Sequence, residues 1–322
     1  MTTTREALGS EGEYVLHLPP LSFPSDFRQL SGSLAISFSA VKLFIQRAKT
    51  SGAQATLTDD DAHLVATMCR KLDGVPLAIE LVAAQVGDHG LRETTALLDR
   101  NMALRWSGPR TGPKRHQTLG ATLDWSYNLL SGSERSVLRQ LTVFAGGFTL
   151  DAVRAVVAGS DVNGDGLQSF THLVAKSLVS ANDNPATRYR LLDSTRAYAA
   201  LKLTSDIERQ AIKRRHALYV VSWLQGAAAS ARSVKRELSL MRTETGNVRA
   251  AVEWAFSEAG DRSIAIDLAV SSAPLWLGQA LYTECQGWML KASGLARQMT
   301  DVSSRHRLSI QMALGSSEGR YR

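Results

Sequence analysis

The residues best suited to bind a metal ion form a short run of oxygen-bearing side chains, Asp161, Asn163 and Asp165, followed by Gly166. This alternation matches the first half of an EF-hand loop, whose carboxylate and carbonyl oxygens bind Ca²⁺. The last position of such a loop requires a bidentate glutamate, and this sequence has His172 there. A polar turn therefore explains the run better than a calcium site, and we predict no metal ligands.

A second pattern, from Gly315 through Ser317 to Gly319, has the G-x-S-x-G spacing of a hydrolase nucleophile elbow. In an elbow, however, the acid and the histidine partner follow the serine, and the sequence has no histidine after Ser317. The histidines elsewhere stand singly, without an H-x-x-x-H pair. We predict no catalytic residues.

The two cysteines, Cys69 and Cys285, are too far apart to indicate a metal site or a disulfide framework, so we expect buried free thiols. The net charge is +7, and the basic residues cluster only at Arg209, Lys213, Arg214 and Arg215. A solvated helix face explains this cluster better than a nucleic-acid patch, although both interpretations stay open.

The composition is that of a globular protein, with 44% hydrophobic and 21% charged residues in a chain of 322. This length allows two or three domains. The sequence lacks the long apolar run of a membrane span and the apolar core of a signal peptide. We expect a cytoplasmic protein with no membrane partner.

The longest informative stretch, residues 62–86 (AHLVATMCRKLDGVPLAIELVAAQV), predicts two helices joined by a tight corner. The apolar positions of the first helix recur at helical spacing: Val65, Met68, Cys69 and Leu72. Asp73 and Gly74 interrupt this pattern. Pro76 suits the first turn of the second helix, because its missing N–H would have no partner there.

This corner closely resembles the GLPLA-type motif of the STAND class of signal-transduction ATPases, which have an NB-ARC-like nucleotide-binding region. The resemblance is to large bacterial transcriptional regulators of the LuxR or AfsR type. It implies that Gly74, Pro76 and Leu77 lie against the adenine of a bound nucleotide and serve as lid and sensor. The corner alone would favour an ordinary helical hairpin. The match from CRKLDG to AIEL favours the motif.

Residues 1–30 resemble the end of the nucleotide-binding core of the same family. Thr3, Thr4 and Arg5 stand at the position of a sensor strand, and residues 15–21 at that of the final strand. The resemblance implies that Arg5 senses the terminal phosphate. A P-loop (Walker A) requires G-x-x-x-x-G-K-[ST], yet the sequence has no Gly-Lys dipeptide, and the family places Walker B before residue 1. The family resemblance implies ATP or ADP as a ligand. Because the P-loop is missing, we do not expect this chain alone to hydrolyse ATP.

Residues 117–205 have the pattern of a winged helix, in which three or four helices precede a hairpin. Ser131 and Glu134 predict a capping box, and Thr149 can cap a third helix. A fourth helix is expected to carry Leu167, Phe170 and Val174. Residues 178–181 and 189–192 flank the turn-rich sequence NDNPAT, which predicts the hairpin.

This region also resembles the winged helix of the same regulators, which packs on the nucleotide-binding core and transmits its state. The helix before the hairpin would enter the major groove, but it offers only Gln168, His172 and Lys176 as contacts. DNA-reading helices carry Arg, Lys, Asn or Gln more densely. We therefore expect signal transmission, and we disfavour direct DNA binding.

Residues 206–322 continue as helices. Trp254 and Trp288 are 34 positions apart, the period of tetratricopeptide-type repeats. The family commonly ends in such a helical superhelix, which binds an inducer or a protein partner. A plain helical bundle is the alternative.

The sequence thus predicts a mainly α chain in four parts. These are the end of an α/β NTPase core (1–30), a helical lid module (31–108), a winged helix (109–205) and incomplete TPR-like repeats (206–322). We expect a truncated, STAND-type regulatory module that acts by conformational switching and protein interaction, and no enzyme. The alternative is part of an ATP-binding, DNA-binding transcriptional regulator whose chain extends upstream.

Overall fold

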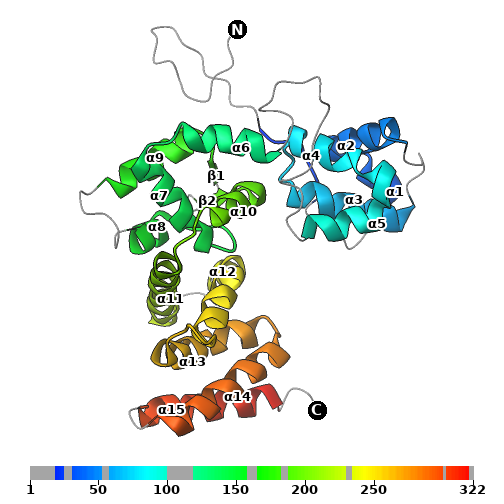
Figure 1. The fold of residues 1–322 in the computed structure, drawn as a ribbon. Coiled ribbons are helices and arrows are strands. Elements are labelled where there is room, and N and C mark those ends of the chain that lie inside the picture. Colours follow the sequence, from blue (N-terminus) through cyan, green and yellow to red (C-terminus); the bar gives the residue numbers. More distant parts are fainter. Residues whose placement is uncertain are drawn as a thin grey trace. The chain divides into compact units, whose positions relative to one another are not determined.

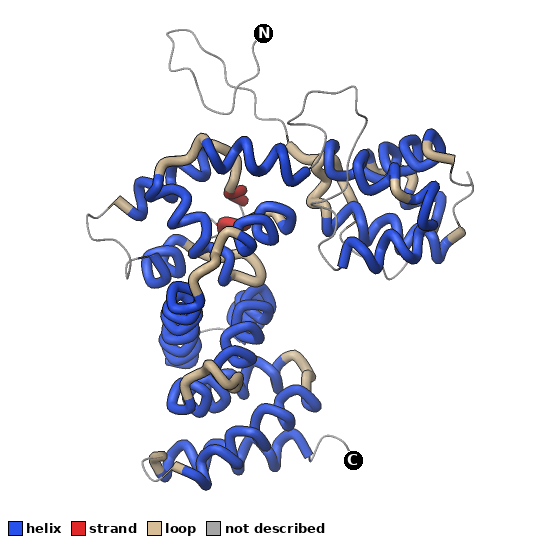
Figure 2. Tube along the Cα trace, in the orientation of Figure 1, coloured by secondary structure: helices blue, strands red, loops and turns tan. Residues whose placement is uncertain are grey.

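A computed structural model describes residues 19–24, 31–52, 58–99, 119–157, 165–182, 188–229, 234–299 and 302–318. These residues are mostly helical, with one two-stranded sheet among them, which confirms the predicted mainly α fold (Figures 1 and 2). The chain divides into two compact units. Unit 1 comprises Met1–Arg135, His172–Val179 and Leu192–Lys202, and unit 2 comprises Ser136–Thr171, Ser180–Leu191 and Leu203–Arg322.

Unit 1 begins with a group of helices: α1 (Gly32–Ala35), α2 (Ser39–Thr50), α3 (Asp59–Lys71), α4 (Pro76–Ala84) and α5 (Val86–Asp99), which is kinked at Gly90. Helix α3 begins with a capping box. The hydroxyl of Thr58 accepts the N–H of Asp61, and the Asp61 carboxylate accepts the N–H of Thr58. This capping box satisfies two backbone donors at the start of α3.

The core of unit 1 lies between these helices, where α2 packs on α4 and α3 packs on α5. The apolar positions predicted for α3 are all buried, and the largest side chains around them are Phe44, Met68, Leu72 and Ile79. Burial of such side chains contributes roughly 1.5–3 kcal/mol each. Apolar spacing therefore located the core of this unit correctly.

The predicted winged-helix region contains α6 (Leu119–Asn128), α7 (Gly132–Gln140), η3 (Leu141–Val143), α8 (Leu150–Val157), α9 (Gly166–Ala175), β1 (Val179–Asn182), β2 (Arg188–Leu191) and α10 (Asp193–Leu201). Thr149 caps α8, because its hydroxyl accepts the N–H of Ala152 at 3.3 Å. Strands β1 and β2 pair, and Phe148 adds an antiparallel bridge to Tyr189. The predicted hairpin is confirmed.

The predicted fourth helix is α9, and it carries Leu167, Phe170 and Val174. Leu167 is 36% exposed, whereas Phe170 and Leu173 on α9 are buried. Leu167 lies in the first turn of α9, so the buried face of this helix begins after that residue.

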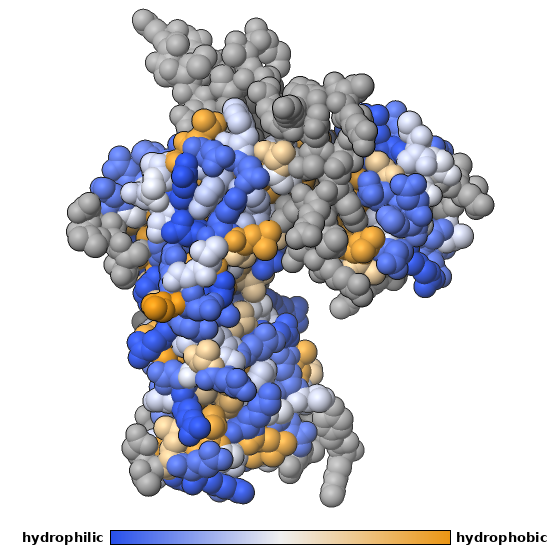
Figure 3. Space-filling model, viewed as in Figure 1, coloured by the Kyte–Doolittle hydropathy of each residue, from blue (hydrophilic) through white to orange (hydrophobic). Residues whose placement is uncertain are grey.

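Unit 2 ends in five helices: α11 (Asp206–Ala229), α12 (Val234–Ala255), α13 (Arg262–Gly278), α14 (Tyr282–Gln298) and α15 (Ser304–Glu318). Successive helices pack on one another, and α13 also contacts α11 and α15. The indole of Trp276 is fully buried in their shared core and donates to the hydroxyl of Ser272 at 2.9 Å. On the face shown in Figure 3, the described surface is mainly hydrophilic, with small separate hydrophobic areas.

Candidate functional site

The predicted corner at residues 73–76 is present and has a demanding backbone conformation. Asp73 and Gly74 have φ values of 51° and 67°, in the left-handed region. A Cβ on Gly74 would lie 2.1 Å from the carbonyl oxygen of Leu21, so no side chain fits there. Pro76 then occupies the first turn of α4, as predicted. The corner therefore requires glycine for both its conformation and its packing.

The segment 19–24 is hydrogen-bonded to this corner. The N–H of Leu21 donates to the carbonyl of Gly74 at 2.9 Å. The next residue, Ser22, accepts the N–H of Ala40 with its carbonyl at 3.0 Å and donates its own N–H to the hydroxyl of Ser39 at 2.8 Å. The corner and the start of α2 are thus joined through a single short segment.

The predicted nucleotide-contact residues are placed as follows. Gly74 is buried, Pro76 is exposed and Leu77 is partly exposed, so the corner presents apolar surface beside a tight backbone turn. Arg5 lies outside the described residues. These three residues are neighbours in the chain, and Leu21 lies beside Gly74 in the structure.

Sequence reasoning missed a contact between this corner and helix α10. The carboxylate of Asp73, which is only 3% exposed, accepts the backbone N–H of Asp193 in the first turn of α10. The residue before α10, Leu192, provides no side-chain cap. The sequence around Asp73 does not indicate this contact with α10, because the partner residue is 120 positions away.

Helix α10 is also braced against α6 by a polar cluster. The Asp124 carboxylate accepts hydrogen bonds from the Tyr198 hydroxyl and from Lys202, whose Nζ lies 2.8 Å away. These bonds lower the pKa of Asp124, and burial with the Asp124 bond raises the pKa of Tyr198 to about 12. The Lys202 ammonium also lies 4.9 Å from the centre of the Tyr198 ring. This cluster fixes the second half of α10.

The helix expected to face DNA, α9, has its cationic end neutralised. Lys176, just after α9, lies 2.9 Å from Oε1 of Glu134, and Nδ1 of His172 lies 3.3 Å from the same oxygen. Burial alone would raise the pKa of Glu134, but the bonds from Lys176 and from the Ser131 N–H lower it. Gln168 remains exposed. Two of the three predicted DNA contacts therefore serve an internal carboxylate.

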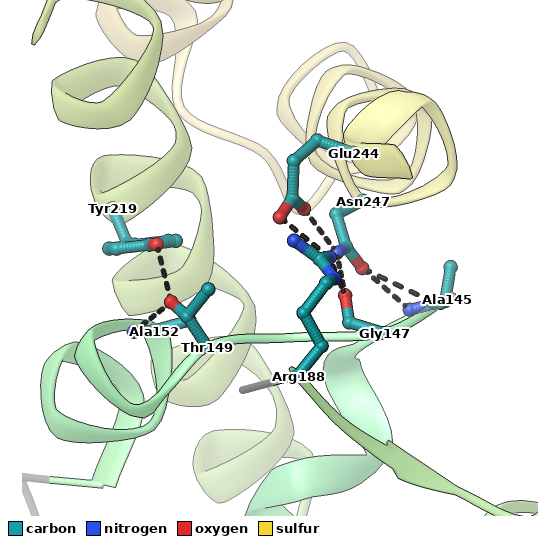
Figure 4. A network of polar contacts seen from close by, with 9 residues as sticks. Ala145, Gly147, Thr149, Ala152, Arg188, Tyr219, Glu244 and Asn247 are labelled. Carbon is teal, nitrogen blue, oxygen red and sulfur yellow. Dashed lines mark hydrogen bonds and ion pairs between the residues drawn. The ribbon is translucent and has the colours of Figure 1, made fainter. Parts of the chain in front are cut away.

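A polar network joins helix α12 to the turn before α8 and to strand β2 (Figure 4). The side-chain Oδ1 of Asn247 accepts the N–H groups of Ala145 and Gly146 at 3.0 and 3.3 Å, and its Nδ2 donates to the carbonyl of Gly147 at 2.9 Å. Arg188 of β2 donates to the same carbonyl at 2.7 Å and lies 2.8 Å from Glu244. We call this set of residues the α12 clamp.

The α12 clamp is largely removed from solvent. Glu244 and Asn247 are 7% and 3% exposed, and they hydrogen-bond to each other at 2.7 Å. The Arg188 side chain is 20% exposed. A guanidinium with a carboxylate and a carbonyl partner in such surroundings makes strong, directional bonds. The base of the hairpin is thereby fixed to α12.

The basic cluster on α11 is largely used inside unit 2. Arg209 pairs with Asp206, and Arg214 lies 3.6 Å from Asp261. Arg215 donates to the carbonyl of Val156 at 2.7 Å and to Gln140 at 3.1 Å, and burial lowers its pKa. These contacts favour the structural interpretation of the cluster over a nucleic-acid patch.

The element order and the hairpin agree with a comparison against known domain families. Residues 130–204 match the winged helix-turn-helix domain family. This segment is a winged helix domain. In the element order of a winged helix, α9 stands at the place of the recognition helix and the hairpin of β1 and β2 at the place of the wing.

The whole chain is also similar to longer mycobacterial proteins. Proteins of Mycobacterium bovis and Mycobacterium tuberculosis, whose names assign them provisionally to the HTH-type transcriptional regulators, are 35% identical over 316 residues. This match covers 98% of the chain but 33% of each relative. An uncharacterized Mycobacterium tuberculosis protein is 39% identical over 220 residues, which is 67% of the chain and 52% of that protein. The chain thus spans about a third to a half of these relatives.

Other predicted chemistry can be tested only in the described part of the chain. No cluster of potential metal ligands occurs there, and no helix in these ranges is long and apolar enough to cross a bilayer. Most of the EF-hand-like run, residues 161–164, lies outside it. Cys69 and Cys285 are free and buried, as predicted, and burial raises the pKa of Cys69 to about 12.

Proposed function

We propose that this chain is a regulatory module of a transcriptional regulator, in which the winged helix transmits a conformational state between parts of the protein. The similarity of nearly the whole chain to proteins named as HTH-type transcriptional regulators supports the regulatory role. The α12 clamp carries the transmitting role, because it binds the base of the wing to the C-terminal helices instead of leaving it free.

The electrostatics of the recognition helix support the same proposal. Lys176 and His172 both face Glu134, so the end of α9 offers little positive charge to a DNA backbone. Phosphate contacts supply much of the affinity of DNA-binding proteins. In our proposal the winged helix therefore contacts protein, and the C-terminal helices, for which we keep the proposed TPR-like arrangement, receive an inducer or protein partner.

We further propose a STAND-type switch with the domain boundaries predicted above. Its nucleotide would lie against the exposed Pro76 and the partly exposed Leu77, since apolar side chains suit a planar base. In such a switch the corner would adopt one conformation with bound nucleotide and another without it. Arg5 remains a proposed phosphate contact, and the sequence offers no Gly-Lys dipeptide for a P-loop.

Direct DNA binding by the winged helix is the second candidate function, favoured by the names of the relatives. On the described part of α9, Gln168 and Thr171 are exposed and could contact base edges.

Fluorescence anisotropy with a labelled DNA duplex distinguishes the two functions. We expect the full chain to bind weakly, with a low salt dependence that Gln168→Ala and His172→Ala leave unchanged. Tight binding with a steep salt dependence that these substitutions weaken would favour DNA reading instead.

A titration with fluorescent ADP and ATP tests the switch. Micromolar binding that weakens in Pro76→Ala would support the lid role of the corner, with Gly132→Ala as a control far from it in sequence. If no binding occurs at millimolar nucleotide, the STAND-type mechanism fails for this chain while the transmitting role of the winged helix stands.

A further inference from the structure

A hydrogen bond joins the corner at residues 73–76 to the winged helix, from the Asp193 N–H to the Asp73 carboxylate. The first N–H groups of a helix have no partner within the helix and usually bond to a side chain just before it. Leu192 stands at that position in α10 and cannot accept such a bond. A residue 120 positions away therefore caps the helix.

The position of the Asp73 carboxylate depends on the backbone of the corner. Asp73 has a φ of 51°, an uncommon conformation for a residue with a side chain, and it is 3% exposed. Gly74 follows with its own left-handed conformation, pressed against the carbonyl of Leu21. Because these torsions aim the side chain, any rearrangement of the corner moves the carboxylate.

The charge of the Asp73 carboxylate also favours its position at the start of α10. The N-terminus of α10 carries the positive end of the helix dipole, which a negative carboxylate stabilises. Asp193 itself pairs with Arg196 at 3.1 Å, inside the same helix. Asp73 therefore brings a charge that belongs to the corner to the first turn of α10.

The other end of α10 is held independently. Tyr198 and Lys202 bond to Asp124 of α6, so the second half of the helix has contacts of its own that do not involve Asp73. A change at Asp73 is thus concentrated on the junction between β2 and α10, where Leu192 lies.

We propose that Asp73 is a positioning residue that couples the corner to the winged helix by capping α10. The purpose of this coupling rests on the switch proposed above, whereas the contact itself can be tested without any ligand. A rearrangement that withdraws Asp73 would free the first turn of α10 and the adjoining end of the wing. In this way the state of the corner would reach the winged helix.

Hydrogen exchange of the full chain tests the proposal with three variants. Asp73→Gly removes the carboxylate and tolerates the left-handed backbone, whereas Asp73→Asn keeps an acceptor oxygen and loses the charge. Leu192→Ser, added to Asp73→Gly, gives α10 a local cap that has no connection to the corner. Circular dichroism confirms that each variant is folded before exchange is measured.

We expect Asp73→Gly to speed exchange about tenfold at two places, amides 193–195 of α10 and the amides of Val75 and of residues 77–79 at and after the corner, as loss of one bond to a charged group implies. Asp73→Asn should largely restore the slow exchange. Leu192→Ser should restore it in α10 alone and leave the corner fast. Restoration confined to α10 would show that the slow exchange of its first turn depends on a cap, which in the native chain comes from Asp73 of the corner.

Three results would overturn the proposal. Exchange in α10 could stay unchanged in Asp73→Gly, Leu192→Ser could restore both sites together, or Asp73→Gly could fail to fold even with Leu192→Ser. The last result would make Asp73 a structural requirement of the corner. None of these results depends on nucleotide or DNA, so failure of the coupling is distinguishable from failure of the proposed function.

Discussion

The Oδ1 atom of Asn247 accepts the backbone N–H of Ala145 at 3.0 Å, although the two residues are 102 positions apart. One amide side chain thereby bonds directly from helix α12 to the backbone of the turn before α8 (Figure 4). Backbone groups have fixed directions, so this contact specifies both the distance and the orientation of the helix against the turn. An amide suits the position because it accepts and donates at once.

We therefore expect any substitution of Asn247 that removes the acceptor, the donor or both to destabilise the protein. We expect Asn247→Ala to reduce the free energy of unfolding by about 2–4 kcal/mol, because it leaves buried donors without a partner. Asn247→Asp should cost more than alanine, since a carboxylate cannot donate to Gly147 and would face Glu244 at 2.7 Å. Chemical denaturation measures both. If aspartate were tolerated better than alanine, the assigned orientation of the amide would be wrong.

Lys176 and Glu134 predict a pH dependence. The Glu134 side chain is 4% exposed and its folded pKa is lowered, so the pair stabilises the protein above the unfolded pKa of about 4.3 and loses this contribution as the pH falls. Lys176→Met should reduce stability by about 2 kcal/mol at neutral pH and move acid unfolding to higher pH. Circular dichroism across a pH series follows the change.

An exposed ion pair provides the comparison for Lys176. Arg154 and Asp151 have side chains that are 57% and 81% exposed, so Arg154→Met should change stability by less than about 0.5 kcal/mol. Equal effects of the two substitutions would show that the burial of Glu134 does not matter.

His216 should be a source of instability. Its Nε2 is buried with no hydrogen-bond partner among the described residues, and burial lowers its pKa to about 4. The unfolded chain therefore binds more protons between pH 6.5 and 4, and stability falls by up to about 3 kcal/mol as the pH drops through this window. We expect His216→Leu to raise stability by about 1 kcal/mol at pH 7 and by more at about pH 5.

Thermal unfolding at the two pH values checks this prediction, with the exposed His89→Gln as a control that should show neither effect. A loss of stability in His216→Leu at both values would mean that packing of the imidazole edge against Phe144, at 5.3 Å between ring centres, outweighs the orphaned nitrogen.

Glycine is required at position 74 for two reasons, the left-handed backbone and the close approach of Leu21, and Gly52 shares only the first of them. Gly52 has a φ of 90°, but no atom lies within 4 Å of the place a Cβ would take, so Gly52→Ala should cost only the backbone strain, about 1 kcal/mol. Gly74→Ala adds a clash with Leu21 and should cost about 2–4 kcal/mol. Similar values in urea unfolding would indicate that the segment 19–24 yields easily.

Local sequence patterns predicted much of this fold, because their causes are local. The box formed by Ser131 and Glu134 satisfies backbone groups within a few residues, and Pro76 starts a helix where its missing N–H would have no partner. The exposure of Leu167 depends on which turn of α9 meets its neighbours, and spacing alone does not contain that information.

The contacts that define the candidate sites were not predictable in this way. Asp73 finds Asp193, and Asn247 finds Ala145, across more than a hundred residues. Each side chain looked like an ordinary polar residue at a helix end or on a helix face. Only the packing of distant helices decides that such a residue becomes buried and must find a partner.

The burial of both thiols has a practical consequence for following motion in this protein. Cys69 and Cys285 are inaccessible in the folded chain, and their raised pKa values leave little of the reactive thiolate at neutral pH. The two native thiols should therefore not compete for fluorophores or spin labels that are attached to introduced surface cysteines. Distance changes between labelled helices could then be recorded without first replacing any native residue.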